Sequence, residues 1–336
     1  MDLTTLTGKR LALIFPGQGS QHVGMGKRIQ QLSAAARRVF AQADEVLGFS
    51  LSRLCFEGPE AELNDTINAQ PAILTVSLAY LEALRERLRA LGTTIQPALV
   101  AGHSLGEFSA LVAAGTLSFE DALRIVRERG RLMKESAQQR PGGMAAILGL
   151  GRDAVEDVCK EASVLGLIVV ANDNSPGQLV ISGEEAALQQ AMELARARGA
   201  RRVVRLNVTV PSHSPLMERV AQALSDLLSR VPLREPDVPL VSNVTGRVVS
   251  RVEELRQALA QQVAQPVQWT TVVRAIADQG VTTFLEVGPG QVLTGLVRKI
   301  RADLEALSVH ELALEAPGAG ALDHDVSNER RRGANG

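Results

Sequence analysis

Residues 97–115 read PALVAGHSLGEFSALVAAG, an apolar run followed by a glycine-flanked serine and a second apolar segment. The residues that lead up to Gly102 predict a short buried strand, and those after Ser104 predict a helix that ends at Gly115. Ser104 lies between Gly102 and Gly106, the spacing of a nucleophile elbow, in which a sharp turn from strand to helix exposes the serine hydroxyl. The stretch therefore predicts an α/β fold with a reactive serine, the alternative being a turn that merely contains one.

The segments on either side of this stretch predict the rest of a main parallel sheet. Apolar runs predict further strands at 10–15, 237–244 and 282–288. Helical spacing predicts helices near 25–47 and at 75–92, 118–136 and 291–300, the last of them closing the fold. Strands that alternate with helices in this way are typical of an α/β protein.

Residues 143–207 differ in pattern from the segments around them. They predict the order strand, helix, strand, strand, helix, strand, which is the split β-α-β pattern of a small separate sheet. We therefore expect an inserted subdomain. The predicted division is a catalytic domain made of 1–138 and 208–315, an inserted subdomain at 139–207 and a disordered tail at 316–336.

Composition and charge exclude several classes of protein. The chain has 336 residues, of which 45% are hydrophobic and 22% charged, and this favours an ordered chain with a large core. Its net charge of −1 offers no general attraction to nucleic acid or to an anionic membrane. The first residues do not resemble a signal peptide, and no apolar stretch approaches the ~20 residues that span a bilayer. We expect a cytoplasmic protein with no nucleic-acid or membrane partner.

The cysteines and histidines give no indication of a metal site. The two cysteines, Cys55 and Cys159, form no disulfide framework and lack the spacing of zinc ligands. None of the five histidines stands in a metal-binding motif. We expect no metal.

A serine nucleophile needs a general base, which is usually a histidine. His213 follows the inserted segment in the sequence VPSHSPLM, at a predicted break between strand and helix. The histidines that compete with it on sequence alone are His22, His103, His310 and His324. His103 adjoins Ser104, but at a tight turn its side chain should point away from the serine hydroxyl.

No acidic residue obviously completes a serine-histidine-aspartate triad. The aspartates between Ser104 and His213 in the sequence are Asp121, Asp153, Asp157 and Asp173. A backbone carbonyl could orient the imidazole instead. Glu107 has no evident catalytic role, because a carboxylate in the first turn of a helix is explained by the helix dipole.

Two backbone N–H groups are candidates for an oxyanion hole, the donors that stabilise charge on a reacting carbonyl oxygen. One belongs to Leu105, at the start of the helix after the serine. The other belongs to Gln18, in the turn FPGQGSQ at 15–21 that follows the first strand. This turn is no dinucleotide fingerprint, because His22 occupies the position of the third glycine. A simple tight turn is the alternative.

Arg129 has the most informative position of the charged residues. On the helix predicted at 118–136 it falls on the apolar stripe with Val126 and Met133, whereas its basic neighbours fall on another face. A buried guanidinium needs an anion. Two sources of that anion stay open: a structural aspartate or glutamate, and the carboxylate of a substrate.

Several motifs now agree with one another in order along the chain. They are FPGQGSQ, GHSLGE, the helix of Arg129, NSPGQLVISG, VPSH, QPVQWT and EVGPGQVLTGL, which together extend over residues 9–312. This set resembles the malonyl-CoA:acyl-carrier-protein transacylases, the loading enzymes of bacterial fatty acid synthesis, and the related polyketide acyltransferases. The resemblance implies an α/β-hydrolase-like core with a parallel sheet and an inserted ferredoxin-like subdomain.

The resemblance also implies a reaction and the residues that perform it. Malonyl would move from CoA to the phosphopantetheine thiol of acyl carrier protein by a ping-pong serine-ester mechanism, with no cofactor. Ser104 would be the acylated nucleophile and His213 its base, and the N–H groups of Gln18 and Leu105 would form the oxyanion hole. In this family a main-chain carbonyl holds the histidine, and that position falls on Gln262.

Substrate binding is implied at two further residues. Arg129 would pair with the free carboxylate of the malonyl group, and Gln70 falls on a residue that lines the pocket of the family. The sequence departs from the family at Phe108, where tyrosine is frequent. VPSH at 210–213 differs from the tetrapeptides by which modular polyketide domains are sorted, and it favours malonyl, although Ser212 does not exclude a bulkier extender.

Other functions stay open on the sequence. A trans-acting polyketide acyltransferase, with malonyl or another extender, would share all of these motifs. A serine thioesterase or other hydrolase would share the elbow and the base but gives Arg129 no role. A scaffold that only docks carrier protein would not need an intact serine-histidine pair. We expect an enzyme that acts as a monomer, with malonyl-CoA and acyl carrier protein as its partners.

Overall fold

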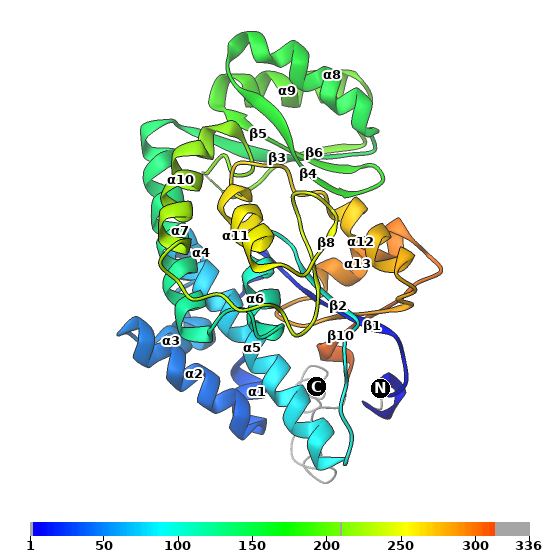
Figure 1. The fold of residues 1–336 in the computed structure, drawn as a ribbon. Coiled ribbons are helices and arrows are strands. Elements are labelled where there is room, and N and C mark those ends of the chain that lie inside the picture. The colour runs from blue at the N-terminus through cyan, green and yellow to red at the C-terminus, as the bar shows by residue number, and fades with distance from the viewer. Residues whose placement is uncertain (1–2, 209, 313–336) are drawn as a thin grey trace, which may run out of the picture.

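The computed structural model describes residues 3–208 and 210–312, which form an α/β protein with two sheets (Figure 1). The main sheet has six strands: β1 (Leu11–Phe15), β2 (Leu99–Gly102), β7 (Leu240–Val241), β8 (Val248–Val249), β9 (Thr283–Glu286) and β10 (Glu305–Ser308). Their order across the sheet is β10-β9-β1-β2-β7-β8. All neighbouring pairs are parallel except β7 and β8, so the predicted parallel α/β sheet is confirmed, with an antiparallel edge.

Helices cover both faces of the main sheet. Those that precede residue 140 are α1 (Lys27–Leu32), α2 (Ala34–Leu47), α3 (Leu51–Glu57), α4 (Glu60–Asn64), α5 (Thr66–Ala90), α6 (Gly106–Ala113) and α7 (Phe119–Gln139). Those that follow residue 210 are α10 (Glu218–Leu228), α11 (Val252–Gln261), α12 (Trp269–Asp278) and α13 (Val292–Ile300). Short 3-10 helices lie at Leu3–Leu6, Ser163–Leu165, Pro215–Met217 and Val309–Glu311.

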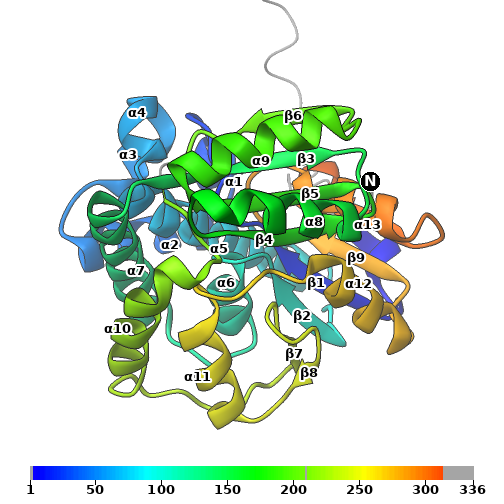
Figure 2. The same ribbon diagram turned by 90° about the horizontal axis from the view of Figure 1, so that it is seen from above.

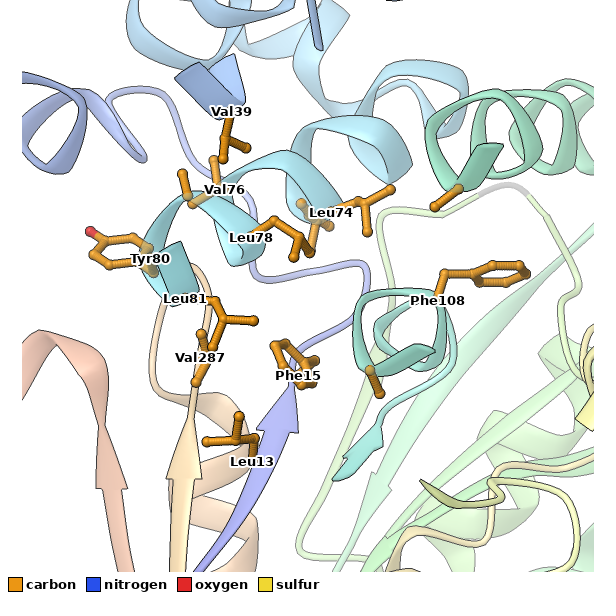
Figure 3. Packing of buried hydrophobic residues seen from close by; sticks show 14 of the residues in the cluster. Leu13, Phe15, Val39, Leu74, Val76, Leu78, Tyr80, Leu81, Phe108 and Val287 are labelled. Carbon is orange, nitrogen blue, oxygen red and sulfur yellow. The ribbon is translucent and has the colours of Figure 1, made fainter. Parts of the chain in front are cut away.

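Strand β1 shows why this sheet lies in the centre of the molecule. Its side chains are all buried and point alternately to the two faces. Leu13 and Phe15 pack in one apolar cluster with side chains of α5 and α6, and Figure 3 shows them beneath Leu78 of α5. Ile14 packs on the other face with α12 and α13. A strand with both faces covered reads as a continuous apolar run, which is the pattern of residues 11–15.

The second, smaller sheet lies above the main sheet in Figure 1 and is antiparallel throughout. It contains β3 (Gly142–Leu148), β4 (Ile168–Ser175), β5 (Gln178–Glu184) and β6 (Arg202–Arg205), in the order β4-β5-β3-β6. Helices α8 (Arg152–Ala162) and α9 (Glu185–Ala197) cover one face, where they share an apolar cluster with the strands (Figure 2). The elements follow one another in the order predicted from residues 143–207.

Some predicted elements differ in extent from those observed. The helix predicted near 25–47 is two helices, because Ser33 interrupts it and caps α2 by accepting a hydrogen bond from the Ala36 N–H. Helix α5 begins at Thr66, nine residues before the predicted start, with Asp65 as its cap. Strand β10 was not predicted, and it follows the helix that was expected to close the fold.

The strand predicted at 237–244 is reduced to the two residues of β7. The predicted tail at 316–336 lies outside the described residues. No helix in the described part of the chain combines the length and the apolar composition needed to cross a bilayer.

Candidate active site

The predicted elbow is present between β2 and α6. Ser104 has a φ of 50°, in the left-handed region. The turn depends on both glycines: a Cβ on Gly102 would lie 1.9 Å from the backbone carbon of Gly106, and one on Gly106 would lie 2.1 Å from the carbonyl oxygen of Phe15. Asn243, in the loop after β7, accepts a hydrogen bond from the Ser104 N–H at 2.8 Å. Close packing of strand, turn and helix therefore fixes the serine.

His213 is the histidine that reaches the serine. Its Nε2 lies 2.8 Å from Ser104 Oγ, and the side chain is buried. Its Nδ1 lies 2.9 Å from the carbonyl oxygen of Gln262 and 3.1 Å from that of Gln265. Since carbonyl oxygens only accept, Nδ1 carries the proton and Nε2 is free to accept one from the serine. Two carbonyls stand where a triad would have its acid, and Gln265 was not predicted from the sequence.

Burial keeps the imidazole of His213 neutral. Burial and, to a smaller extent, the positive charge of Arg129 together lower the pKa of His213 to about 3, while the Gln262 carbonyl acts in the opposite direction. The pKa of the neighbouring His103 is also lowered, again through burial. At neutral pH both rings are therefore uncharged, the state in which an imidazole can accept a proton.

The other predicted candidates for base or acid lie elsewhere. His103 points away from the serine hydroxyl, as predicted, and its Nε2 lies 2.8 Å from Asn174 Oδ1. His310 contacts the Gly288 carbonyl, and His324 lies outside the described residues. Of the aspartates considered, Asp121 donates its N–H to the hydroxyl of Ser118, which caps α7, and Asp173 accepts from Thr270.

Arg129 is buried on α7 with 2% of its surface exposed. Its guanidinium donates to Gln70 Oε1 at 2.8 Å, to Gln262 Oε1 at 3.1 Å and to Ser104 Oγ at 3.3 Å. Burial lowers the pKa of Arg129 to about 10, and the charge of Glu107 opposes that shift. No acidic side chain of the described residues forms a direct ion pair with Arg129; Glu107 is connected to it through the Gln262 side chain.

Three polar side chains surround the guanidinium without lining the cleft. Gln70 is fully buried and holds Arg129 from α5, while its Nε2 donates to Thr66 Oγ1 at 2.9 Å. Gln262 contributes its side chain as well as its carbonyl, a contact that was not predicted. Glu107 is 1% exposed and accepts from the Asn243 N–H at 3.1 Å and from Gln262 Nε2. The helix dipole alone is therefore an incomplete explanation of Glu107.

The two predicted oxyanion donors lie on the same cleft as Ser104. The cleft is lined by Gln18 and Leu105, and no described residue accepts a hydrogen bond from either backbone N–H. Gly17 allows the turn that carries Gln18 to lie against the backbone of His103, because a Cβ on Gly17 would lie 2.4 Å from the His103 carbonyl oxygen. Both residues thus border the cleft beside the serine, with backbone N–H groups that no described residue uses.

The cleft has a volume of about 440 Å³ and lies between the two sheets. Ser104, His213 and Arg129 lie on the side of the main sheet. The side of the small sheet contributes amide and apolar groups, among them Asn172, Asn174, Leu206 and Val208. No group of three or more potential metal ligands occurs within residues 3–208 and 210–312. The arrangement can therefore activate a serine hydroxyl next to a buried positive charge.

Known proteins that are similar to this chain in sequence and fold belong to one family. The model of the acyl transferase domain family matches residues 12–318. The malonyl CoA-acyl carrier protein transacylase of Bacillus subtilis is 44% identical over 303 residues, which are 90% of this chain and 94% of that protein.

Solved structures give the same result. The malonyl-CoA:acyl carrier protein transacylase from Xanthomonas oryzae aligns with a TM-score of 0.85 at 44% identity, over 90% of this chain and 95% of its own. A malonyl-transacylase solved in complex with a type II PKS acyl-carrier protein aligns with a TM-score of 0.85 at 39% identity, over 92% of this chain and 97% of its own. This chain belongs to the acyl transferase domain family and, within it, to the malonyl CoA-acyl carrier protein transacylases.

Proposed function

We propose that this protein transfers malonyl from CoA to the phosphopantetheine thiol of an acyl carrier protein. The observation that carries the proposal is the Ser104 Oγ to His213 Nε2 distance of 2.8 Å, beside a buried guanidinium without an ionic partner among the described residues. The named relatives, which align over 94% and 95% of their own length, support the same activity. No metal or redox cofactor takes part in the proposed steps.

The first half of the reaction acylates the serine. His213 Nε2 takes the proton of Ser104 as Oγ bonds to the thioester carbon. The carbonyl oxygen becomes an anion, stabilised by the N–H groups of Gln18 and Leu105; one such donor contributes ~10²–10³ in rate. The intermediate then collapses: the bond from carbon to sulfur breaks, and the imidazolium protonates the departing CoA sulfur.

The second half reverses these steps with a different thiol. The phosphopantetheine thiol of the carrier protein loses its proton to His213, and its sulfur attacks the ester carbon of malonyl-Ser104. The bond from carbon to Oγ breaks, and the proton returns from His213 to the serine. The carbonyls of Gln262 and Gln265 keep Nδ1 protonated throughout, so Nε2 alone exchanges the proton.

Arg129 supplies the preference for malonyl in this mechanism. A carboxylate on the acyl group would pair with the guanidinium, whereas acetyl would leave it without an anion. A site of this kind can reject a substrate that lacks the matching group by up to ~10⁴. Val210 and Ser212 of the VPSH segment also line the cleft, and they leave a bulkier extender open.

Replacing Arg129 tests this role. Arg129→Ala should lose malonyl transfer by roughly 10³–10⁴ while acetyl transfer rises, because the neutral acyl group no longer faces an unpaired charge. The measurement is kcat/KM for both CoA esters. Arg131→Ala is the control, since this exposed neighbour on α7 pairs with Glu128 and Glu135 and does not line the cleft. Full malonyl preference in Arg129→Ala would refute the carboxylate role.

A more specific description of the fold belongs to the same proposal. We take the main sheet with its two helical layers as an α/β-hydrolase-like core, supported by the elbow between β2 and α6. The small sheet corresponds to a ferredoxin-like subdomain, supported by its order β4-β5-β3-β6 and by two helices on one face. The boundaries at 139 and 207 remain those predicted from the sequence.

The pathway and setting are further parts of the proposal. The relative solved with a type II PKS acyl-carrier protein supports polyketide synthesis as an alternative to fatty acid synthesis, with this chain acting in trans. A cytoplasmic, monomeric enzyme is the arrangement we predict from the sequence. Sedimentation of the purified protein with and without carrier protein checks the monomer.

A hydrolase is the rival function, since it shares the serine and the histidine. Incubation with malonyl-CoA and holo acyl carrier protein separates the two, because the transferase produces malonyl-carrier and the hydrolase produces free malonate. We expect malonyl-carrier in excess. Free malonate as the main product would favour the hydrolase, and no turnover at all would favour a docking scaffold.

A further inference from the structure

Glu107 is a buried carboxylate that the proposed reaction does not use. It lies in the first turn of α6, three residues after the serine, and it does not line the cleft. Its Oε1 accepts from the Asn243 N–H at 3.1 Å, and its Oε2 accepts from Gln262 Nε2. Both partners belong to loops far away in the sequence, so this one carboxylate connects three segments around the site.

The contacts of Gln262 show that the Glu107 carboxylate fixes the orientation of the Gln262 side-chain amide. Its Nε2 donates to Glu107 and, at 2.9 Å, to the carbonyl oxygen of Ser104. Its Oε1 accepts from Arg129 at 3.1 Å. Carboxylate and carbonyl oxygens only accept, and a guanidinium only donates, so the amide has a single orientation that satisfies all three partners.

The hydrogen-bond partners support an ionised carboxylate at this position. Burial raises the pKa of Glu107, and the hydrogen bonds from Gln262 and Asn243 and the charge of Arg129 oppose that rise without cancelling it. A protonated carboxyl would need an acceptor, and both described partners of its oxygens are donors. Glu107 is also the group whose negative charge raises the pKa of Arg129.

We propose that Glu107 is a positioning residue for malonyl specificity. It holds the Gln262 amide with its oxygen toward Arg129, and the amide oxygen in turn holds the guanidinium where a substrate carboxylate binds. The inference rests on the proposed function, in which Arg129 binds that carboxylate. The competing explanation is a purely structural role, in which Glu107 only anchors the backbone of Asn243.

The test compares two buried glutamates. Glu107→Gln keeps the shape of the side chain but places an amide NH₂ against one of two donors and removes the charge. Glu286→Gln is the matched control: Glu286 is also fully buried and accepts from the N–H groups of Leu293 and Thr294, at the start of α13 and outside the cleft. Both variants should lower Tm.

Only Glu107→Gln should change substrate preference. We expect its ratio of kcat/KM for malonyl-CoA over acetyl-CoA to fall roughly 10- to 100-fold, the size typical of a lost hydrogen bond to a charged group. Glu286→Gln should keep the wild-type ratio. An unchanged ratio in Glu107→Gln, with a Tm loss like that of Glu286→Gln, would show that the carboxylate is merely structural.

Gln262→Met tests the same chain of contacts, and it remains informative if Glu107→Gln does not fold. Because Gln262 also orients His213 and contacts the Ser104 carbonyl, the absolute rates can change; the readout is the ratio of kcat/KM for malonyl-CoA over acetyl-CoA, which should fall as in Glu107→Gln. In the double variant the ratio should fall no further than in the single ones, because both remove one connection. An additive double variant, or a wild-type ratio in Gln262→Met, would overturn the proposal.

Arg129→Ala separates this inference from the proposed function. If that variant keeps its malonyl preference, the proposed function of Arg129 is wrong. If it loses the preference while Glu107→Gln retains it, only the positioning role of Glu107 is wrong. Loss of preference in both variants supports the two together.

Discussion

The proposed nucleophile and base share an unusual backbone conformation. Ser104 has a φ of 50° and His213 a φ of 58°, and they are the non-glycine residues with positive φ in the described ranges. Such a conformation costs about 1–3 kcal/mol for each residue and persists only where the surroundings fix it. Here Asn243 accepts from the Ser104 N–H, and the Val263 carbonyl accepts from the His213 N–H at 2.8 Å. Folding therefore stores strain at both ends of the proton transfer.

Removing the serine hydroxyl tests the covalent step. Ser104→Ala should show no malonyl adduct by intact mass after incubation with malonyl-CoA, because the cleft then lacks the hydroxyl that contacts His213. Another described contact of hydroxyl and imidazole, Tyr80 with His310 at 3.4 Å, lies outside the cleft. Ser109→Ala is the matched control, a buried serine of α6 whose Oγ has no hydrogen-bond partner within the described residues. It should acylate like the wild type. An adduct on Ser104→Ala would mean that the nucleophile is another residue.

The base should show an unusual pH dependence. Since the pKa of His213 is lowered to about 3, the neutral form that accepts the serine proton persists far below the ordinary value of 6.5. Acylation by acetyl-CoA should therefore stay flat from about pH 8 to about pH 5, measured by rapid quench. Protonation inactivates the base, so activity is lost only as pH falls through the lowered pKa.

The groups that face His213 predict how this profile responds to mutation. Besides the carbonyls of Gln262 and Gln265, they are Arg129 and His103. Arg129→Ala removes a positive charge, so the pKa of His213 should rise and the acid limb should move to higher pH. A wild-type rate that already falls near pH 6.5, or an acid limb at the same pH in Arg129→Ala and the wild type, would contradict this account.

Among the elements, the junction of β1, β2 and α6 leaves no room for side chains. Gly106→Ala should lower the free energy of unfolding by at least ~2 kcal/mol, because its Cβ meets the Phe15 carbonyl oxygen at 2.1 Å. Urea denaturation followed by circular dichroism measures this.

Gly295 offers the comparison for that substitution. It lies inside α13, and a Cβ there meets nothing within 4 Å. Gly295→Ala should therefore stabilise the protein by ~0.5–1 kcal/mol. If both alanines changed stability alike, the steric explanation for Gly106 would fail.

Elements with a strong local pattern were predicted well, and those determined by distant contacts were not. The apolar run of β1 and the stripe of α7 are visible in the sequence because burial of whole faces determines them. Strand β10 is missed because its sequence, EALS, does not alternate between apolar and polar residues. Its extended conformation depends on pairing with β9. The early start of α5 is hidden by Pro71, which suggests a break but is accommodated inside the helix.

At the scale of the whole molecule, the same limit explains which site residues were found. Ser104, Arg129 and Gln18 stand in recognisable local patterns, so the sequence indicates them. Gln265 and the side chain of Glu107 act through partners more than 50 residues away, as in the contact from His213 to Gln265. Such contacts exist only once the chain has folded.

One contact between the small sheet and the loop at 262–268 has a consequence for protein engineering. Val267, in the loop that also carries Gln262 and Gln265, pairs with β4: its N–H donates to the Ala171 carbonyl, and its carbonyl accepts from the Asp173 N–H, each at 2.9 Å. A chimera that exchanges only residues 139–207 for the corresponding segment of a relative would place a foreign strand against this loop. The donor segment should therefore be transplanted together with residues 262–268, or the imidazole will lose its alignment although no catalytic residue was altered.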